Sequence, residues 1–314
     1  MKLIRTLCVA SAVICTAGMA HAAEFINILT GGTSGVYYPL GVAISQLYGK
    51  ALPDAKISVQ STKASAENMN LLQAGRGELA FALGDVVSNA WNGNAEAGFK
   101  KKLDKLRGVA AIYPNYIQIV ASADSGIKTL ADLKGKRISV GAPKSGTELN
   151  ARAILHAAGI EYSDFAKTEY LPFGESVELM KNRQLDATLQ SAGLGVASIR
   201  DLASSVKIII VPIPESVIKK IGDDAYQPGV IPANTYDGQT ADVPTVRIRN
   251  MLVTRAGVPD EVVYAMTKAI FENLDSLVAA HAAAKAITLK DAATMPLPLH
   301  PGAAKYYREV GLIK

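Results

Sequence analysis

The chain has 314 residues, and its 33 Lys and Arg residues against 28 Asp and Glu residues give a formal net charge of +5. The basic residues are scattered rather than gathered in a stripe with aromatic residues, which argues against a nucleic-acid-binding protein. After the N-terminal segment no apolar run reaches roughly 18 residues, so no transmembrane helix is predicted there. A mature chain of about 290 residues suits two domains better than one small core.

Residues 1–22 have the pattern of a cleavable signal peptide. Lys2 and Arg5 form a basic start, 7–17 an apolar segment, and 20–22 (Ala-His-Ala) a cleavage site. The apolar segment is too short to anchor the chain in a bilayer core of roughly 30 Å. We therefore expect a protein that is exported to the periplasm and is not membrane-spanning after cleavage.

Both cysteines of the chain, Cys8 and Cys15, lie in this N-terminal segment. The mature protein is thus expected to have no disulfide, no catalytic thiolate and no cysteine metal site. Without Lys2 and Arg5 the 33 basic residues become 31 against 28 acidic ones, which is a net charge of +3.

In chain order, the first predicted element is a buried strand over 25–29. A turn of small residues, 30–35, leads from it into a helix that begins at Val36. Such a turn points backbone N–H groups and the positive end of a helix dipole at one spot, which suits a carboxylate or a phosphate. Thr33 and Ser34 add hydroxyl donors. A glycine-rich turn with nothing bound is the alternative that this segment alone leaves open.

Two more units of strand, polar loop and helix follow. Strands are predicted over 56–60 and 79–83. A loop of small hydroxyl residues, 61–65, opens the helix after the first strand, and the second strand ends at Gly84-Asp85. In an open parallel sheet ligands collect outside the carboxyl ends of the strands, so all three units direct polar residues to one edge.

A second α/β series follows two apolar runs, 106–112 and 116–121, which Tyr113, Pro114 and Asn115 separate. Its predicted elements begin with a short helix over 129–135, a strand over 137–140, a loop over 141–147 and a helix over 148–158. A strand over 185–189, which ends in Gln190-Ser191-Ala192-Gly193, and a strand over 207–211 follow.

Prolines and glycines are frequent over 226–246, as in a chain that returns from one domain to another. A strand over 246–254, a helix over 259–274 and a tail over 297–314 complete the prediction.

No catalytic or metal-binding motif stands out. The four histidines show no metal-ligand spacing, and no Gly-x-Ser-x-Gly elbow occurs. Gly141 and Gly146 have the spacing of a phosphate-binding P-loop, but Thr147 stands where the lysine should be. We therefore predict a protein that is not an enzyme and that has no cofactor and no metal.

Tyrosines outnumber phenylalanines by twelve to six. Tyr37, Tyr38, Tyr113 and Tyr116 fall at or near predicted strand ends and the crossover between the two series. Each of them alone is explained by a core tyrosine whose hydroxyl is hydrogen-bonded. As a set beside two hydroxyl-rich helix starts, they indicate the walls of a ligand cleft.

At this point the chain resembles the TAXI-type solute-binding proteins, the extracytoplasmic receptors of one branch of the TRAP transporters. The resemblance covers essentially all of the mature chain. Its most specific parts are 30–41 (Thr-Gly-Gly-Thr-Ser-Gly-Val-Tyr-Tyr-Pro-Leu-Gly) and the tail 299–312, and 65–68 and 145–147 match as well.

The resemblance implies an α/β, two-domain periplasmic-binding-protein fold of type II-like architecture, with a ligand cleft between the domains. Domain I is expected over 23–112 and 226–314, and domain II over 113–225. The implied function is capture of a small carboxylate, such as glutamate or 2-oxoglutarate, by domain closure and its delivery to a TRAP membrane permease. A ligand-presenting adaptor for a sensor kinase and a periplasmic enzyme are the alternatives.

The same resemblance implies the ligand contacts. Those of domain I are Thr33, Ser34, Gly35, Tyr37, Thr62, Ser65, Asn68 and Asp85; those of domain II are Ser145, Gly146, Thr147, Gln190 and Ser191; and Tyr113 and Tyr116 lie near the crossover.

Two charged residues leave questions open. Lys63 stands in a Lys-Ala-Ser sequence where the family tends to have Gly-Gly-Ser, and it either pairs with a second carboxylate or faces solvent. Asp85 would repel a carboxylate unless it meets an amino group. If Asp85 lines the site, glutamate is favoured over 2-oxoglutarate, because only glutamate brings an ammonium.

Overall fold

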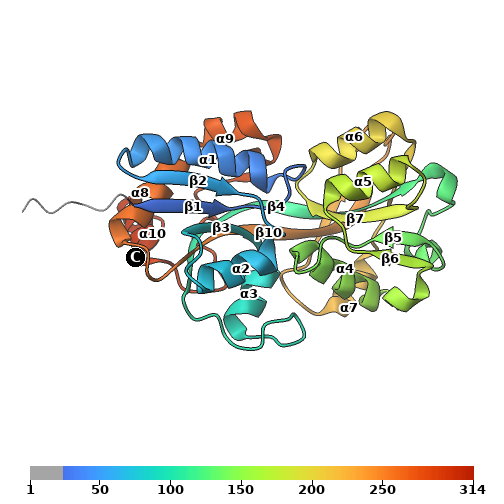
Figure 1. Ribbon diagram of the computed structural model, residues 1–314, viewed down its shortest axis with the longest axis horizontal. Coiled ribbons are helices and arrows are strands. Elements are labelled where there is room, and N and C mark those ends of the chain that lie inside the picture. The colour runs from blue at the N-terminus through green and yellow to red at the C-terminus, as the bar shows by residue number, and fades with distance from the viewer. Residues whose placement is uncertain (1–23) are drawn as a thin grey trace, which may run out of the picture.

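The structure is a computed structural model that describes residues 24–314, so the predicted signal peptide lies outside the described residues. Figure 1 shows two lobes side by side, and two long strands, β4 (Leu106–Ser122) and β10 (Val243–Arg255), run from one lobe into the other. The first lobe contains the blue N-terminal elements and the orange C-terminal helices, while the second lobe is green and yellow. The fold is therefore the two-domain α/β fold that the sequence predicts.

The first lobe is built on three parallel strands in the order β2-β1-β3, with β10 antiparallel beside β3. The carboxyl ends of these parallel strands meet at the edge that faces the second lobe (Figure 1). The elements of this lobe are β1 (Phe25–Leu29), α1 (Tyr37–Ala51), β2 (Lys56–Gln60), α2 (Ser65–Gln73), β3 (Leu79–Leu83), α3 (Gly84–Asn92), α8 (Asp260–Phe271), α9 (Leu274–Ala280) and α10 (Pro301–Glu309).

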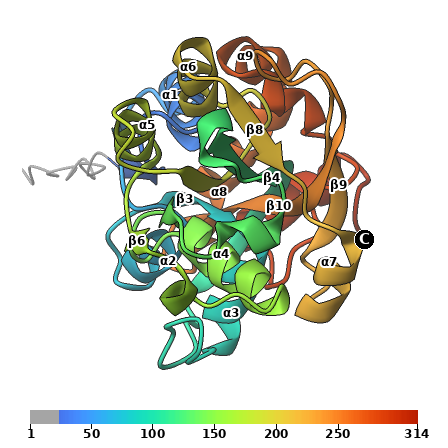
Figure 2. The ribbon, with the colours of Figure 1, turned by 90° about the vertical axis from the view of Figure 1, so that its right-hand side faces the viewer.

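In the second lobe β7 pairs with β4, β5 with β7 and β6 with β5, and β8 pairs with the end of β4. Figure 2 looks onto this lobe and shows α5 and α6 on one side of its strands and α4 and α7 on the other. Its elements are β5 (Arg137–Ser139), α4 (Gly146–Ala157), β6 (Lys167–Glu169), α5 (Phe173–Lys181), β7 (Ala187–Ala192), α6 (Ala197–Ser205), β8 (Ile208–Val211), α7 (Glu215–Ile221) and β9 (Gln227–Ile231). Short 3-10 turns lie at Ala123–Ser125, Leu130–Leu133, Tyr162–Asp164 and Ala282–Ala286.

The two apolar runs 106–112 and 116–121, together with the residues between them, form the single strand β4. Pro114 does not break it. The ladder between β4 and β10 shifts register between Arg249 and Met251, and Pro114 lies opposite Arg249 at that irregularity. A proline lacks the N–H that a regular ladder needs, and an irregular position is where a strand tolerates it.

Among the helix and strand ends that differ from the prediction, two affect the cavity. Helix α4 begins at Gly146, two residues earlier than expected, and β7 continues through Ala192. Gln190 and Ser191 are therefore inside a strand rather than in a loop after it. Ladder pairing with β4, from Tyr116 to Ala121, holds these residues extended.

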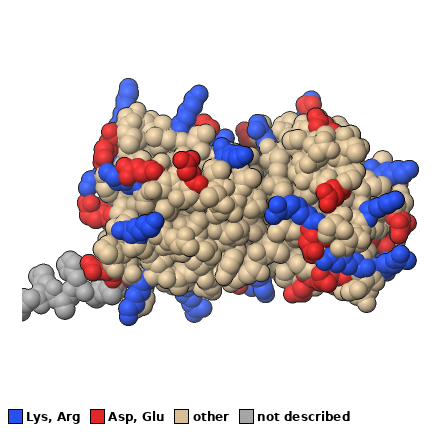
Figure 3. Space-filling model, turned by 90° about the horizontal axis from the view of Figure 1, so that it is seen from above, with Lys and Arg blue, Asp and Glu red and all other residues tan. Residues whose placement is uncertain are grey.

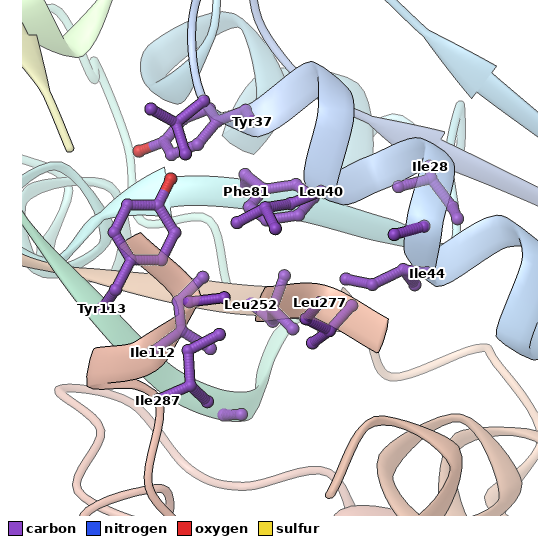
Figure 4. Close-up of a cluster of buried hydrophobic side chains, with 14 of the residues drawn as sticks. Ile28, Tyr37, Leu40, Ile44, Phe81, Ile112, Tyr113, Leu252, Leu277 and Ile287 are labelled. Carbon is purple, nitrogen blue, oxygen red and sulfur yellow. The ribbon is translucent and has the colours of Figure 1, made fainter. Parts of the chain in front are cut away.

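Apolar side chains from α1, β1, β3, β4 and β10 form one continuous core on one side of the sheet (Figure 4). Ile28, Leu40 and Phe81 are fully buried there or nearly so, and Leu252 of β10 joins them. A second core on the opposite side includes Met69 and other residues of α2, α3 and α4. Both cores include residues of both long strands, which makes the connection between the lobes a packed structure rather than a loose linker.

The tail that resembles the family forms α10, which packs on α8 and on the start of β4. Tyr307 donates a hydrogen bond to the carbonyl of Val109 at 2.7 Å. A side chain on Gly302 would place its Cβ 2.1 Å from the carbonyl oxygen of Asp260, so only glycine fits this helix crossing. The tail is thus a packing element of the first lobe, as the sequence suggested.

The domain boundaries at 112/113 and 225/226 stay a prediction. Strand β9 pairs with residues 243–247 of β10, and the hydroxyl of Tyr236 contacts both the side chain of Gln118 and the N–H of Gly195. These contacts hold the segment after 226 against the second lobe. They favour a later return to the first lobe, near the irregularity of β10 between Arg249 and Met251.

Candidate functional site

A cavity of about 380 Å³ lies between the two lobes. That volume is in the range of small-molecule sites, roughly 300–1,000 Å³. Its walls come from the turn after β1, the loops before α2, α4 and α5, the middle of β4 and the end of β7. It therefore lies at the edge where the sequence placed the carboxyl ends of the parallel strands.

The first turns of four helices line this cavity: α1 with Tyr37, α2 with Ser65, α4 with Gly146, and α5 with Phe173. Each of these helices is at least nine residues long. The first N–H groups of a helix have no partner within the helix, and its dipole places a partial positive charge there. Two lobes thus direct four partial positive charges at one enclosed volume.

The sequence around α4 explains how its N–H groups stay free for a ligand. The side chain of Ser145 caps the helix by accepting a hydrogen bond from the N–H of Glu148 at 3.1 Å. That cap satisfies the third N–H of the helix and not those of Gly146 and Thr147, which line the cavity. Lys144 adopts a φ of +64° just before the cap, which turns the loop into the helix.

The lobes are closed on each other. The N–H of Glu67 donates to the carbonyl of Lys144 at 3.2 Å, and the N–H of Ser198 to that of Ser34 at 3.4 Å. A Cβ added to Gly146 would lie 2.6 Å from the Oγ of Ser65, so the first residues of α4 and α2 meet directly. Closure therefore brings two helix ends of the same partial charge together.

A buried hydrogen-bond network forms the floor of the cavity at the hinge. The hydroxyl of Tyr37 donates to Oδ1 of Asn250 at 2.5 Å. Nδ2 of Asn250 in turn donates to Oδ1 of Asn115 at 2.7 Å, and Nδ2 of Asn115 to the carbonyl of Ser191 at 2.7 Å. The network connects α1, β10, β4 and β7, and so it fixes both lobes beneath the cavity.

Two buried hydroxyls that line the cavity have no hydrogen-bond partner within residues 24–314: those of Tyr113 and Ser191. Figure 4 shows the hydroxyl of Tyr113 directed toward Tyr37. Burial raises the pKa of Tyr113 well above its usual value, so this phenol stays protonated. A buried hydroxyl without a partner is costly, and a ligand that accepts its hydrogen bond removes that cost.

The charged side chains among the lining residues are Lys63 and Glu175, and both are exposed. The apolar part of the wall comes from Val36, Leu83, Tyr113, Phe173 and their neighbours. On the face seen in Figure 3 the blue and red side chains are interspersed over both lobes. Within the described part of the chain no group of His, Cys, Asp or Glu residues is arranged to hold a metal ion, and no helix is long and apolar enough to cross a membrane.

The structure brings most of the predicted contacts together. The predicted residues that line the cavity are Thr33, Ser34, Gly35, Tyr37, Thr62, Ser65, Tyr113, Ser145, Gly146, Thr147 and Ser191.

Asn68, Tyr116 and Gln190 are not among the lining residues, and each has another role. Nδ2 of Asn68 donates to the carbonyls of Thr30 at 2.7 Å and Phe81 at 2.8 Å, which ties β1 to β3. Tyr116 packs beneath Gly229 of β9. Oε1 of Gln190 accepts from the hydroxyl of Ser198 at 2.6 Å.

Asp85 also lies outside the cavity wall. It is 1% exposed, and its Oδ2 accepts hydrogen bonds from Asn150 and from Tyr226, each at 2.8 Å. The idea that Asp85 pairs with the ammonium of a bound glutamate therefore has no support in this geometry. Its partners belong to the second lobe, so Asp85 is an interlobe contact.

Sequence reasoning did not single out the start of α5, where Phe173, Gly174 and Glu175 line the cavity. A signal was present: Pro172 immediately precedes a helical pattern, with an acidic residue in its first turn. Asn115 lies between the two apolar runs of the sequence and was not among the predicted contacts, although it lines the cavity.

The model of the NMT1-like family matches residues 28–311. The chain belongs to the NMT1-like family. The match spans both lobes of this family member, including the turn after β1 and the tail helix α10.

Solved structures agree with the fold of this family member. The alkanesulfonate-binding protein SsuA from Xanthomonas axonopodis pv. citri, bound to MOPS, is 17% identical, with 93% of this chain and 96% of that chain covered and a TM-score of 0.52. PhnD1 from Prochlorococcus marinus, in complex with methylphosphonate, is 12% identical, with 92% and 99% covered and a TM-score of 0.58. A binding protein component of an ABC phosphonate transporter from Pseudomonas aeruginosa is 12% identical, with 83% and 79% covered and a TM-score of 0.54. These likenesses establish the fold of a two-lobed periplasmic binding protein.

Proposed function

We propose that this protein is a periplasmic solute-binding receptor that captures a small carboxylate by closing its two lobes and presents it to a membrane transporter. The observation that carries the proposal is the meeting of four helix N-termini around one interlobe cavity. Without an anion, closure places like partial charges face to face. With an anion between them, the same arrangement becomes attractive.

The orphan hydroxyls support the same class of ligand. Those of Tyr113 and Ser191 are ready to donate, and a carboxylate accepts several hydrogen bonds at once. Sulfonates and phosphonates are also oxyanions, and the solved structures of similar fold hold MOPS and methylphosphonate. We favour a carboxylate because the neutral donors of this cavity are supplemented by a single side-chain cation, Lys63.

The proposed partner is a TRAP membrane permease of the kind that TAXI-type receptors serve. The support is the resemblance of 30–41 and 299–312 to that branch. A ligand that touches both lobes only in the closed form shifts the population toward that form, which the permease then recognises. Vesicles that contain a TRAP permease should take up labelled ligand only when this protein is added.

The test of ligand class is a thermal-shift screen of residues 23–314 against glutamate, 2-oxoglutarate, methylphosphonate and an alkanesulfonate, with uncharged sugars as the control. A ligand at about 100 times its Kd stabilises the fold by roughly 2.7 kcal/mol, which raises the Tm measurably. We expect the carboxylates to raise the Tm and the sugars to leave it unchanged. A rise with a sugar and none with any of the anions would contradict the proposal.

A further inference from the structure

Asp85 joins the two lobes at a buried point beside the cavity. It lies in the first turn of α3, next to Leu83, which lines the cavity. Asn150 of α4 and Tyr226, just before β9, approach it from the second lobe. The Nδ2 of Asn150 is 2.8 Å from Oδ2 of Asp85 and 2.9 Å from the hydroxyl of Tyr226, so the three groups form a closed triangle.

Two oxygen atoms of this triangle lack a hydrogen-bond donor in the described part of the chain. Oδ1 of Asp85 and Oδ1 of Asn150 are both buried, and neither has a hydrogen-bond partner within residues 24–314. Both atoms are acceptors when Asp85 is ionised. A proton on Oδ1 of Asp85 converts one of the two into a donor. A protonated carboxyl beside a primary amide can then pair through both of its oxygens, whereas a carboxylate can use only the amide N–H.

We propose that Asp85 takes up a proton from solvent when the lobes close, so that the Asp85–Asn150 contact is a latch whose strength increases as the pH falls. The latch regulates the ligand site of the preceding section and rests on that proposed function for its effect on affinity. When the lobes separate, Asn150 and Tyr226 move away with the second lobe and Asp85 becomes hydrated. The proton is then released.

The surroundings of Asp85 favour the neutral carboxyl. Burial is the main cause that raises its pKa to about 6, and the nearby charge of Asp223 raises it further. The hydrogen bonds from Tyr226 and Asn150 and the nearby backbone N–H of Val86 lower it. The ionisable groups that act on it are Asp223, Tyr226 and, from α1, Tyr37. None of the three is a cation. Both tyrosines have raised pKa values and stay neutral.

The direction of the pH effect follows from the difference between the pKa of Asp85 in the open and the closed state. An aspartate in water has a pKa of about 3.9, so between about pH 4 and pH 6 the closed state holds a proton that the open state lacks. Lowering the pH from 7 to 5 therefore favours closure. Linkage between these two pKa values predicts about a tenfold stronger ligand affinity at pH 5 than at pH 7.

The test is calorimetric titration of glutamate into the full mature protein between pH 5 and pH 7.5, in buffers of different ionisation enthalpy. The wild type should take up about half a proton per glutamate bound at pH 6. In Asp85→Asn the amide imitates the protonated carboxyl, so we expect strong binding at pH 7.5 and no proton uptake from this position. Comparing the two proteins cancels the titration of glutamate itself. Equal proton uptake by both would overturn the proposal.

Two further variants should shift the pH at the midpoint of the gain in affinity, and in opposite directions. Tyr226→Phe removes a hydrogen bond that lowers the pKa of Asp85, so the gain in affinity should begin at higher pH. Asp223→Asn removes a charge that raises this pKa, so the gain should begin at lower pH. The asparagine keeps an oxygen that can accept the hydrogen bond from the N–H of Ala225, which preserves the local turn. Unchanged midpoints in both variants would contradict the assignment to Asp85.

A ligand-free measurement separates this proposal from the proposed function. If no carboxylate binds at any pH, the proposed function fails, and the latch is then tested by small-angle X-ray scattering without ligand. The wild type should be more compact at pH 5 than at pH 7.5, and Asp85→Asn should be equally compact at both. A wild type whose dimensions do not change between these pH values would overturn the latch.

Discussion

Lys63 lines the cavity, and we propose that it is the residue that decides whether a second anionic group is accepted. Its position is at the rim, its side chain is exposed, and no salt bridge is formed by it in the described part of the chain. The helix N-termini suffice for one carboxylate, which leaves the lysine for a second. The sequence posed this choice but could not resolve it, because an exposed lysine is also common where nothing binds.

We predict that Lys63→Met weakens binding of glutamate and 2-oxoglutarate about two- to fivefold and leaves a monocarboxylate such as acetate unaffected. The reason is that an exposed ion pair contributes modestly, and only the second carboxylate reaches it. Titration calorimetry at low and high salt measures both effects. Lys50→Met, at the far end of α1, is the control for loss of one positive charge. Equal losses for mono- and dicarboxylates would show that Lys63 acts on the cavity as a whole.

The position of each residue explains why only some of the predicted contact residues line the cavity. Ser145, Gly146 and Thr147 are at a helix start, where sequence alone determines the exposed N–H groups, and they line the cavity. Asn68 and Asp85 are also polar and also follow parallel strands, but their side chains turn elsewhere. Asn68 donates to the carbonyls of Thr30 and Phe81, and Asp85 accepts from Asn150 and Tyr226. Local sequence gives the edge of the sheet to which a polar residue belongs. It does not give the direction of its side chain, which packing between distant segments decides.

At the scale of elements, periodicity predicted the three βα units of the first lobe because each is local in sequence. The sequence shows β4 only as two apolar runs on either side of Pro114. The irregular pairing with β10, more than 100 residues away in the chain, is what lets one strand continue through this proline. Helix α5 was missed as part of the site for a similar reason. Nothing near Phe173 in the sequence shows that the turn after β1 closes over it, although Gly35 lies against its ring.

The meeting of α2 with α4 gives a prediction at this scale. Gly146→Ala puts a Cβ 2.6 Å from Oγ of Ser65 and from Cδ1 of Leu83, both in the opposite lobe. Gly146 is not among the glycines with a positive φ, so alanine fits the backbone of α4 itself. We therefore expect a ligand-free Tm that is equal to or above that of the wild type and a ligand affinity at least several-fold weaker, measured by thermal shift and calorimetry.

Gly49→Ala is the matched control, because it lies in α1 with open space around its Cβ position. It should leave affinity unchanged. A Gly146→Ala protein that binds as tightly as wild type would show that the two helix ends need not meet in the ligand-bound state.

At the scale of the whole molecule, the closed arrangement combines attractive and repulsive contacts. Interlobe hydrogen bonds from Glu67, Ser198 and Asn150 favour closure. The facing N-termini of α2 and α4, the unpaired hydroxyls of Tyr113 and Ser191, and the desolvated Asp85 oppose it. An anionic ligand removes two of these opposing contributions at once, and a proton removes the third. Ligand and proton thus act on one equilibrium between open and closed lobes.

This balance predicts that the protein in solution at pH 7.5 is mostly open without ligand. The radius of gyration from small-angle X-ray scattering should then be larger than the value calculated from the closed structure. Saturating carboxylate should bring the two values into agreement. Uncharged sugar is the control and should leave the profile unchanged. The physical reason is that a ligand shifts the equilibrium only by its differential affinity, and this cavity offers its full set of donors only when both lobes contribute. A ligand-free profile that already matches the closed structure would mean that the interlobe hydrogen bonds outweigh the facing helix ends.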